Sequence, residues 1–61
     1  MRIYRIEKKS KDGTVRFVSL FYDGVGYRVE WEKRHSCGVF TSRNYDEAIN
    51  YGAQVAYSLS L

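Results

Sequence analysis

The sequence predicts an α+β domain, in which a four-stranded antiparallel meander is packed on one face by a C-terminal helix in the order ββββα. Three observations lead to this fold class. Residues 2–41 hold four runs rich in β-branched and aromatic side chains. Asp-Gly pairs at residues 12–13 and 23–24, which favour tight turns, separate the first three runs. Residues 45–59 repeat apolar or small side chains every three or four positions, the spacing of an amphipathic helix.

The length of 61 residues predicts a single compact domain spanning 1–61, without a linker or tail. Its hydrophobic fraction of 44% and aromatic fraction of 16% are typical of folded chains. No run approaches the roughly 20 apolar residues of a membrane span, and the N-terminus lacks the apolar core of a signal peptide. We therefore expect a cytoplasmic protein with no membrane partner. The single cysteine rules out an internal disulfide.

The first predicted strand, Arg2 to Lys8, mixes apolar and charged side chains and leads to Asp12-Gly13, a pair that type I′ hairpin turns prefer. Strict alternation places Arg2 and Tyr4 on one side of this strand and Arg5 on the other. Because neither side is consistently apolar, the run is typical of an edge strand, where charges discourage aggregation.

The second predicted strand, Val15 to Tyr22, is apolar on both sides. Phe17 and Phe21 share one side with Ser19, and Val18 and Leu20 share the other. This pattern predicts a central strand that is covered on both sides, or that leaves one side for a partner.

The third predicted strand, residues 27–33, alternates most clearly. Tyr27, Val29 and Trp31 alternate with charged residues, so we expect Val29 and Trp31 to face the helix. Residues 34–38 are interpreted as a polar loop and residues 39–41 as a short fourth strand.

Asn44 is a favourable N-cap, and Glu47 stands at the position that closes a capping box. The helix therefore begins here, and Gly52 would let its axis approach the sheet closely although glycine lowers helix propensity. The residues predicted to form the core are Phe17, Val29, Trp31, Phe40, Ala48, Ile49, Val55 and Ala56.

No catalytic or metal site is predicted. His35 and Cys37 are a possible base and nucleophile, but no third group is evident to orient the histidine. Glu30 and Glu32 are interpreted as solvated charges, and no set of four Cys and His ligands exists. The chain is therefore interpreted as non-enzymatic, with no cofactor.

The formal net charge of +3 is unevenly distributed. Six basic and two acidic residues in positions 1–16 give +4, whereas residues 45–61 hold only two acidic residues. A basic segment attracts phosphates or an acidic protein surface. One hypothesis is therefore a nucleic-acid-binding β-sheet, in which an exposed aromatic face stacks bases while flanking cations contact phosphates.

Two short segments resemble RNA-binding motifs. Residues 16–21 (Arg-Phe-Val-Ser-Leu-Phe) resemble the aromatic strand motif of RNA-recognition domains but lack its glycines. Residues 38–42 (Gly-Val-Phe-Thr-Ser) are similar to the turn into a helix in the hybrid-binding domains attached to ribonuclease H, without the tryptophan that follows the serine there. Neither segment is long enough to carry a site residue over to this chain.

The favoured hypothesis is a small protein-binding module that presents aromatic and arginine side chains to a larger protein or ribonucleoprotein complex. Its size and layout are similar to those of small phage or mobile-element inhibitors of host defence or nucleic-acid-processing complexes, including anti-CRISPR proteins. A homodimer is a further alternative, because the monomer's core is thin. The candidate binding residues are Arg2, Tyr4, Arg5, Arg16, Tyr22, Arg28, Tyr51 and Tyr57.

Overall fold

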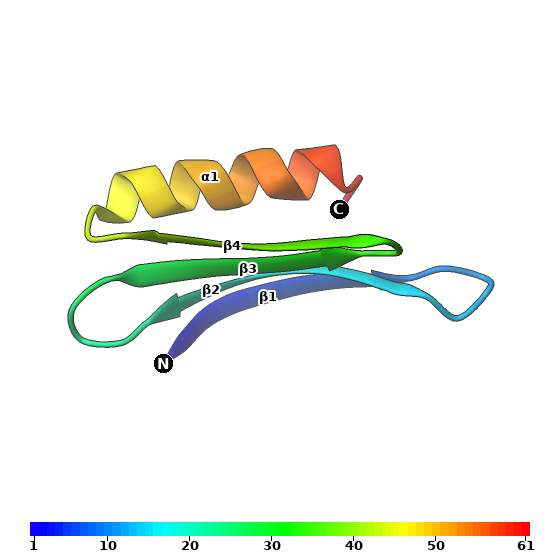
Figure 1. Cartoon of the computed structure of the whole chain (residues 1–61), viewed down its shortest axis with the longest axis horizontal. Coiled ribbons are helices and arrows are strands. Elements are labelled where there is room, and N and C mark those ends of the chain that lie inside the picture. Colours follow the sequence, from blue (N-terminus) through cyan, green and yellow to red (C-terminus); the bar gives the residue numbers. More distant parts are fainter.

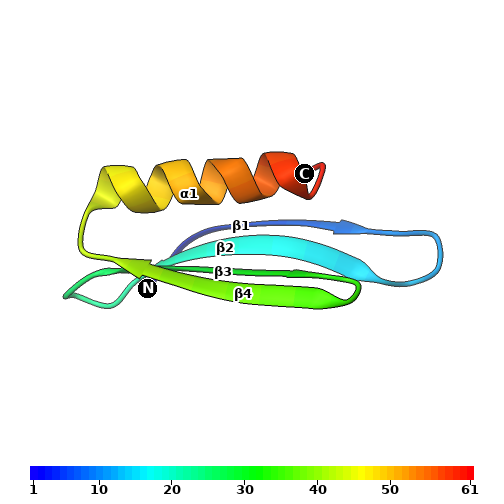
Figure 2. The same ribbon diagram turned by 45° about the horizontal axis from the view of Figure 1, so that its top comes forward.

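The computed structural model describes residues 1–61 and confirms the ββββα fold (Figure 1). The strands are β1 (Arg2–Lys9), β2 (Val15–Tyr22), β3 (Tyr27–Lys33) and β4 (Ser36–Ser42), and the helix is α1 (Tyr45–Ser58). The four strands form one antiparallel sheet in the order β1-β2-β3-β4. Helix α1 packs over one side of the sheet, against β2, β3 and β4, and no element covers the other side (Figures 1 and 2).

The core lies between α1 and the central strands. Val18 and Leu20 of β2, Val29 of β3 and Ala48 of α1 have no exposed surface. Register explains the cluster, because Leu20 lies opposite Val29 and opposed residues in an antiparallel pair share one face. A ring of partly buried residues packs against these four: Tyr4, Tyr27, Trp31, Phe40, Ile49, Tyr51, Val55, Ala56 and Leu61. Of the eight predicted core residues, Val29 and Ala48 belong to the buried cluster, and five more are partly buried and pack against it: Trp31, Phe40, Ile49, Val55 and Ala56.

Phe17 is the core prediction that is wrong. It lies opposite Glu7 of β1 and Glu32 of β3, on the face away from the helix, where it is only partly buried. The reason is that both sides of β2 are apolar. Alternation separates its side chains into two sets without saying which set the helix covers, and the helix covers the set containing Val18 and Leu20.

The start of α1 is capped as predicted, but only in part. The Asn44 side chain accepts a hydrogen bond from the Glu47 backbone N–H at 3.0 Å. The reciprocal half of a capping box is not made, because the Asn44 N–H donates to the Ser42 hydroxyl at 3.0 Å. The expected capping box is therefore corrected to an N-cap that is supported from the end of β4.

The far end of α1 is held by β2 and by its own last residues. The guanidinium Nη1 of Arg16 donates to the Leu59 carbonyl at 2.9 Å, which places a cation at the negative end of the helix dipole. Ser60 has a φ of 60°, and the Leu61 N–H donates to the Ala56 carbonyl at 2.8 Å. A left-handed residue of this kind is a common way to end a helix, although glycine is the usual choice.

The close approach of α1 to the sheet is confirmed at Gly52, which is buried. The Tyr4 hydroxyl of β1 occupies the place that a Cβ at Gly52 would take. Any larger residue in this position would have to displace either the helix or the tyrosine, because close-packed interiors leave no spare volume.

Two predictions about the connections are wrong. A type I′ turn needs positive φ at both central residues, but of Asp12 and Gly13 only Gly13 has it, at 91°. The turn is instead closed by the Gly13 N–H, which donates to the Ser10 carbonyl at 3.0 Å. The predicted loop at 34–38 is also shorter, because β4 already begins at Ser36, which lies opposite Lys33.

Helix α1 has 14 residues, and the chain has no helix that is long and apolar enough to cross a membrane.

Candidate functional site

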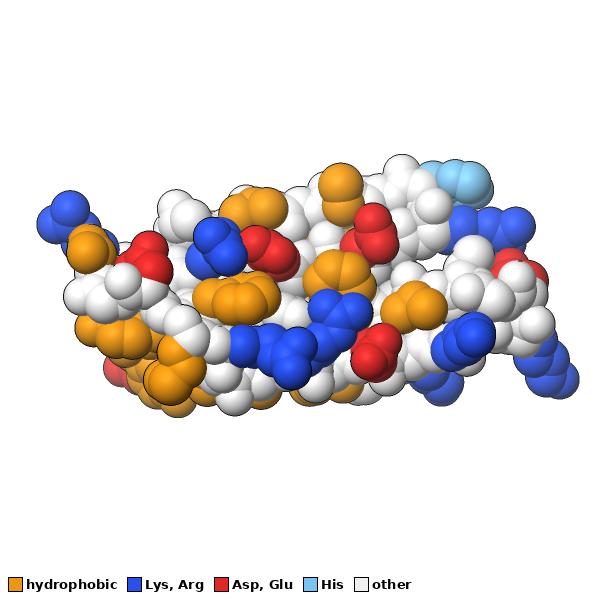
Figure 3. Space-filling view, turned by 90° about the horizontal axis from the view of Figure 1, so that it is seen from below, with side chains coloured by type: hydrophobic (Ala, Val, Ile, Leu, Met, Phe, Trp, Pro, Cys, Tyr) orange, Lys and Arg blue, Asp and Glu red, His pale blue; other side chains and the backbone are white.

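The candidate site is the side of the sheet opposite α1, here called the open face (Figure 3). Hydrophobic side chains lie between basic and acidic ones on this surface (Figure 3). Cross-strand register assigns the residues of this face: Arg5, Glu7 and Lys9 of β1, Phe17, Ser19 and Phe21 of β2, Arg28, Glu30 and Glu32 of β3, and Cys37, Val39 and Thr41 of β4.

Two phenylalanines at the centre of the open face are each covered by an arginine from a neighbouring strand. The Arg5 guanidinium lies 4.0 Å from the centre of the Phe17 ring, and that of Arg28 lies 4.9 Å from the centre of the Phe21 ring. Both distances fall within the range of cation–π contacts, which contribute about 0.5–1 kcal/mol at exposed sites. The rings are thus shielded from water by charged groups that themselves remain solvated.

Glutamates hold these arginines in place along the same strands. Arg28 Nε lies 2.7 Å from a carboxylate oxygen of Glu30, and Arg5 Nη2 lies 3.7 Å from one of Glu7. Three of the four side chains are more than one-third exposed, and that of Arg5 is 31% exposed. Such exposed pairs contribute little stability, so their main effect is to orient the guanidinium groups.

Ser19 lies beneath this polar layer, at the centre of β2. It is 0% exposed, and its hydroxyl has no hydrogen-bond partner. In register it lies between Arg5 of β1 and Glu30 of β3. A buried hydroxyl without a partner costs about 1–3 kcal/mol. Sequence reasoning grouped Ser19 with Phe17 and Phe21, but it did not predict that Ser19 is buried.

Arg2 joins the open face through a β-bulge. The register of β1 against β2 shifts between Arg2 and Tyr4, so that Arg2 lies opposite Phe21 and Tyr4 lies opposite Leu20. The sequence-based expectation that Arg2 and Tyr4 share a face is therefore wrong, because an extra residue in one strand inverts the alternation. As a result, Arg2, Arg5 and Arg28 flank the two phenylalanines.

Four of the eight candidate binding residues lie on the helix side instead. Arg16 contacts the end of α1, and Tyr4 packs against Gly52. The Tyr22 ring packs in a tilted arrangement against that of Tyr27, with the ring centres 4.9 Å apart, and Tyr51 stacks on Phe40 with the ring centres 4.2 Å apart. These side chains support the fold.

The eighth candidate, Tyr57, is 89% exposed on α1, the element that covers the other side of the sheet. Only Arg2, Arg5 and Arg28 of the candidate set therefore come together.

A shallow hollow of about 200 Å³ lies beside Phe17, at the β3–β4 side of the open face. Phe17, Glu32, Cys37 and Val39 contribute to its lining, and Val39 is 65% exposed. A hollow of this size accommodates part of one side chain of a partner, and its walls combine apolar and acidic groups.

The charges of the open face nearly cancel. This face carries four basic residues (Arg2, Arg5, Lys9 and Arg28) and three acidic residues (Glu7, Glu30 and Glu32), so its net charge is +1. Most of the protein's positive charge therefore lies outside this face.

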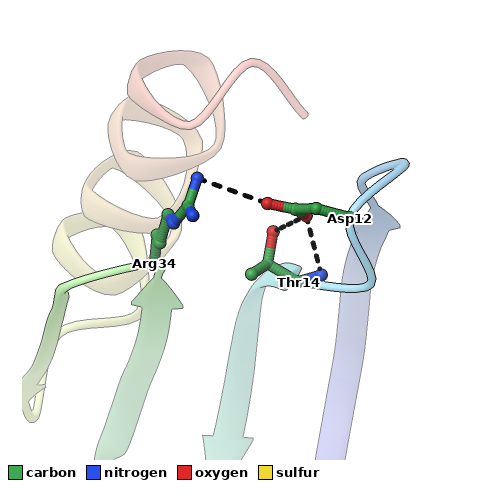
Figure 4. A network of polar contacts seen from close by, with 3 residues as sticks. All are labelled: Asp12, Thr14 and Arg34. Atoms are coloured by element: carbon green, nitrogen blue, oxygen red, sulfur yellow. Dashed lines mark hydrogen bonds and ion pairs between the residues drawn. The ribbon is translucent and has the colours of Figure 1, made fainter.

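Several of the remaining cations lie at the end of the sheet that carries the β1–β2 and β3–β4 turns. The two turns are joined there by an ion pair of 3.2 Å between Arg34 and Asp12 (Figure 4). The Thr14 hydroxyl and backbone N–H both donate to Asp12, and these bonds lower the pKa of its carboxyl group. At the opposite end of the sheet, the N–H groups of Gly26 and Val25 lower the pKa of Asp23 in the same way.

The structure brings no three His, Cys, Asp or Glu side chains into a metal-binding group. His35 lies in the β3–β4 turn and Cys37 on the open face of β4, both exposed. The chain matches no protein-family model, and searches among curated proteins and solved structures gave no significant match.

Proposed function

We propose that this chain is a small, non-enzymatic protein-binding module that contacts its partner through the open face. The observation that carries the proposal is the pair Phe17 and Phe21, each covered by an arginine that a glutamate orients. Phenylalanine and arginine are both enriched at the core of protein–protein interfaces, and arginine is also frequent among the residues that dominate binding energy. Their placement on rigid strands limits the conformational entropy lost on binding.

The near-neutral charge of the open face supports a protein partner over a polyphosphate. Binding to nucleic acid depends on neutralising several phosphates, but Glu7, Glu30 and Glu32 offset most of the positive charge here. The two rings are also already covered by guanidinium groups, so a base could stack on them only after displacing Arg5 or Arg28. A protein surface can instead pair with both charges and enter the hollow beside Phe17.

The partner that fits this arrangement is a larger protein or ribonucleoprotein complex. One domain of 61 residues with a single contact face is suited to covering a functional surface of such a complex, as small phage or mobile-element inhibitors and anti-CRISPR proteins do. Because the chain is basic, an acidic rim around the partner's site would favour rapid association.

Nucleic-acid binding remains the second candidate, for one specific reason. Arg2, Arg5 and Arg28 lie on the same face as two phenylalanines. Proteins that bind single-stranded nucleic acids combine cationic and aromatic side chains in this way. If bases displace the guanidinium groups from the rings, those groups become free to contact phosphates.

The test is an affinity pull-down from bacterial lysate, with and without nuclease, using two matched double variants. Arg5→Gln/Arg28→Gln removes two positive charges from the open face. Lys11→Gln/Lys33→Gln removes two charges elsewhere. We expect the first variant to capture at least about tenfold less partner protein than the unmodified chain. The second variant should capture as much partner protein as the unmodified chain, also after nuclease treatment.

Two results would overturn the proposal. Equal losses in both variants, with binding that weakens steeply as salt rises and disappears with nuclease, would assign the chain to nucleic acid. Undiminished protein capture by the Arg5→Gln/Arg28→Gln variant would place the contact on another surface.

A further inference from the structure

The two edges of the sheet differ in how they are protected against pairing with another strand. Edge strand β1 carries five charged residues among eight, namely Arg2, Arg5, Glu7, Lys8 and Lys9. It also contains the bulge between Arg2 and Tyr4. Charged side chains and bulges are the features by which natural sheets prevent a further strand from adding to an edge.

Edge strand β4 has none of these features. Its seven residues, Ser-Cys-Gly-Val-Phe-Thr-Ser, include no charge and no proline. Its register against β3 runs without a shift from Ser36 to Ser42. No element lies beside its outer edge in Figure 2. Backbone N–H and C=O groups of alternate residues therefore point outward from a straight, uncharged strand, which is a template for another strand.

We propose that β4 pairs antiparallel with β4 of a second copy of this chain, centred on Val39, to form a continuous eight-stranded sheet. The inference concerns the edge of the sheet and does not depend on what the open face binds.

Charge favours β4 over β1 as the edge at which two copies pair. Each copy carries a net charge of +3, so two copies repel unless their contact avoids the cations. Pairing centred on Val39 places Ser36 opposite Ser42 of the second copy, and Cys37 opposite its Thr41. All paired side chains are then uncharged. Pairing β1 with itself would oppose basic residues, which destabilises a strand pair.

Exposure points to the same centre. Val39 is 65% exposed, and its neighbours on the same face of β4 are the small residues Cys37 and Thr41. In the symmetric pairing it meets Val39 of the second copy, and opposed β-branched side chains stabilise neighbouring strands. The two-fold axis is perpendicular to the sheet, so both open faces lie on the same side. An edge contact between two strands is smaller than a standard interface, so we expect a dimer with micromolar or weaker affinity.

Cysteine cross-linking tests the centre of the pairing directly. In a Cys37→Ser background, Val39→Cys places two thiols opposite each other at a distance that a disulfide spans. The matched control is Ala53→Cys in the same background, on the exposed side of α1. Under mild oxidation we expect covalent dimer to form at least about tenfold faster from the Val39→Cys protein than from the control. Sedimentation of the unmodified chain should show a concentration-dependent dimer.

A second variant, compared with Phe21→Ala, separates this edge from the rest of the open face, on which the Val39 side chain also lies. Val39→Lys adds a charge to β4 at an exposed position, so the monomer should keep its circular dichroism spectrum while the dimer fraction falls several-fold. Equal cross-linking rates, a monomer at millimolar concentration, or a dimer that persists in Val39→Lys would each overturn the inference. A dimer lost in Phe21→Ala but retained in Val39→Lys would instead place the second copy on the open face.

Discussion

Gly52→Ala tests the packing of α1 on β1, because its sign should depend on Tyr4. Alanine at a helix interior position is about 1 kcal/mol more favourable than glycine. In this protein, however, the added methyl would occupy the place of the Tyr4 hydroxyl. Overpacking of this kind costs about 1–3 kcal/mol. We therefore expect Gly52→Ala alone to lower the free energy of unfolding, by up to about 2 kcal/mol.

Tyr4→Phe should reverse this effect. Without the hydroxyl, the nearest tyrosine atom to the added methyl is Cζ at 3.5 Å, an ordinary van der Waals contact. In the Tyr4→Phe background, Gly52→Ala should therefore raise the free energy of unfolding by about 1 kcal/mol, the helix-propensity gain alone. The coupling between the two sites should be about 1–3 kcal/mol.

Urea denaturation followed by the fluorescence of Trp31, the only tryptophan, measures all four members of this cycle. Ala53→Gly, at an exposed position of the same helix, supplies the local propensity difference as a control. If Gly52→Ala has the same sign and size in both backgrounds, the contact between Tyr4 and Gly52 does not limit the helix–sheet distance, and the packing argument fails.

Further predictions concern five positions. Trp31→Ala should cost about 3 kcal/mol by circular dichroism in urea, at the low end for tryptophan because the ring is only partly buried. Gly38→Ala should lower the free energy of unfolding by about 1–3 kcal/mol, since its Cβ would lie 2.6 Å from three atoms of the Trp31 ring. Ser60→Gly should raise the thermal midpoint, because glycine adopts the left-handed conformation of residue 60 without the steric cost of about 1–2 kcal/mol that a residue with a Cβ bears. Burial raises the pKa of Tyr4 above 10.0, so the folded state holds that proton longer than the unfolded state. Stability should therefore fall as pH rises above about 10, and less so in Tyr4→Phe. The lowered pKa of Asp23 has the opposite effect on the pH dependence of stability, because the folded state gives up that proton more readily than the unfolded state. Its contribution is present above about pH 4 and lost as pH falls below that, and Asp23→Asn should flatten this acid limb in pH-dependent unfolding.

The fold was predictable because its main determinants are local in sequence. The alternation in β3, the Asn44 cap and the helical spacing after it each specify one element. Where the local signal is absent, prediction failed. The turn at Arg34-His35 contains no glycine, asparagine or proline, the residues that usually indicate a turn. The first residues of β4 are small and polar, so the sequence did not predict that strand pairing begins at Ser36.

The candidate site was less predictable, because it depends on register between strands. A single bulge moved Arg2 to the open face, and the two apolar sides of β2 left the position of Phe17 undetermined. The contacts of Arg5 with Phe17 and of Arg28 with Phe21 join residues of different strands. Such contacts follow from three-dimensional pairing and have no signature in a single strand's sequence.

The strand order also has a consequence for how the chain folds. Because β1, β2, β3 and β4 are neighbours in the same order along the chain and in the sheet, each strand pairing closes only a short loop. Loops of a few residues close in about 10–100 ns, and hairpins form within microseconds. The longest-range contacts are those of α1 with the first two strands, including Tyr4 with Gly52 and Arg16 with Leu59. We therefore expect the helix to dock after the rate-limiting step, with mutations at Ala48 affecting mainly the unfolding rate and mutations in the hairpins affecting the folding rate.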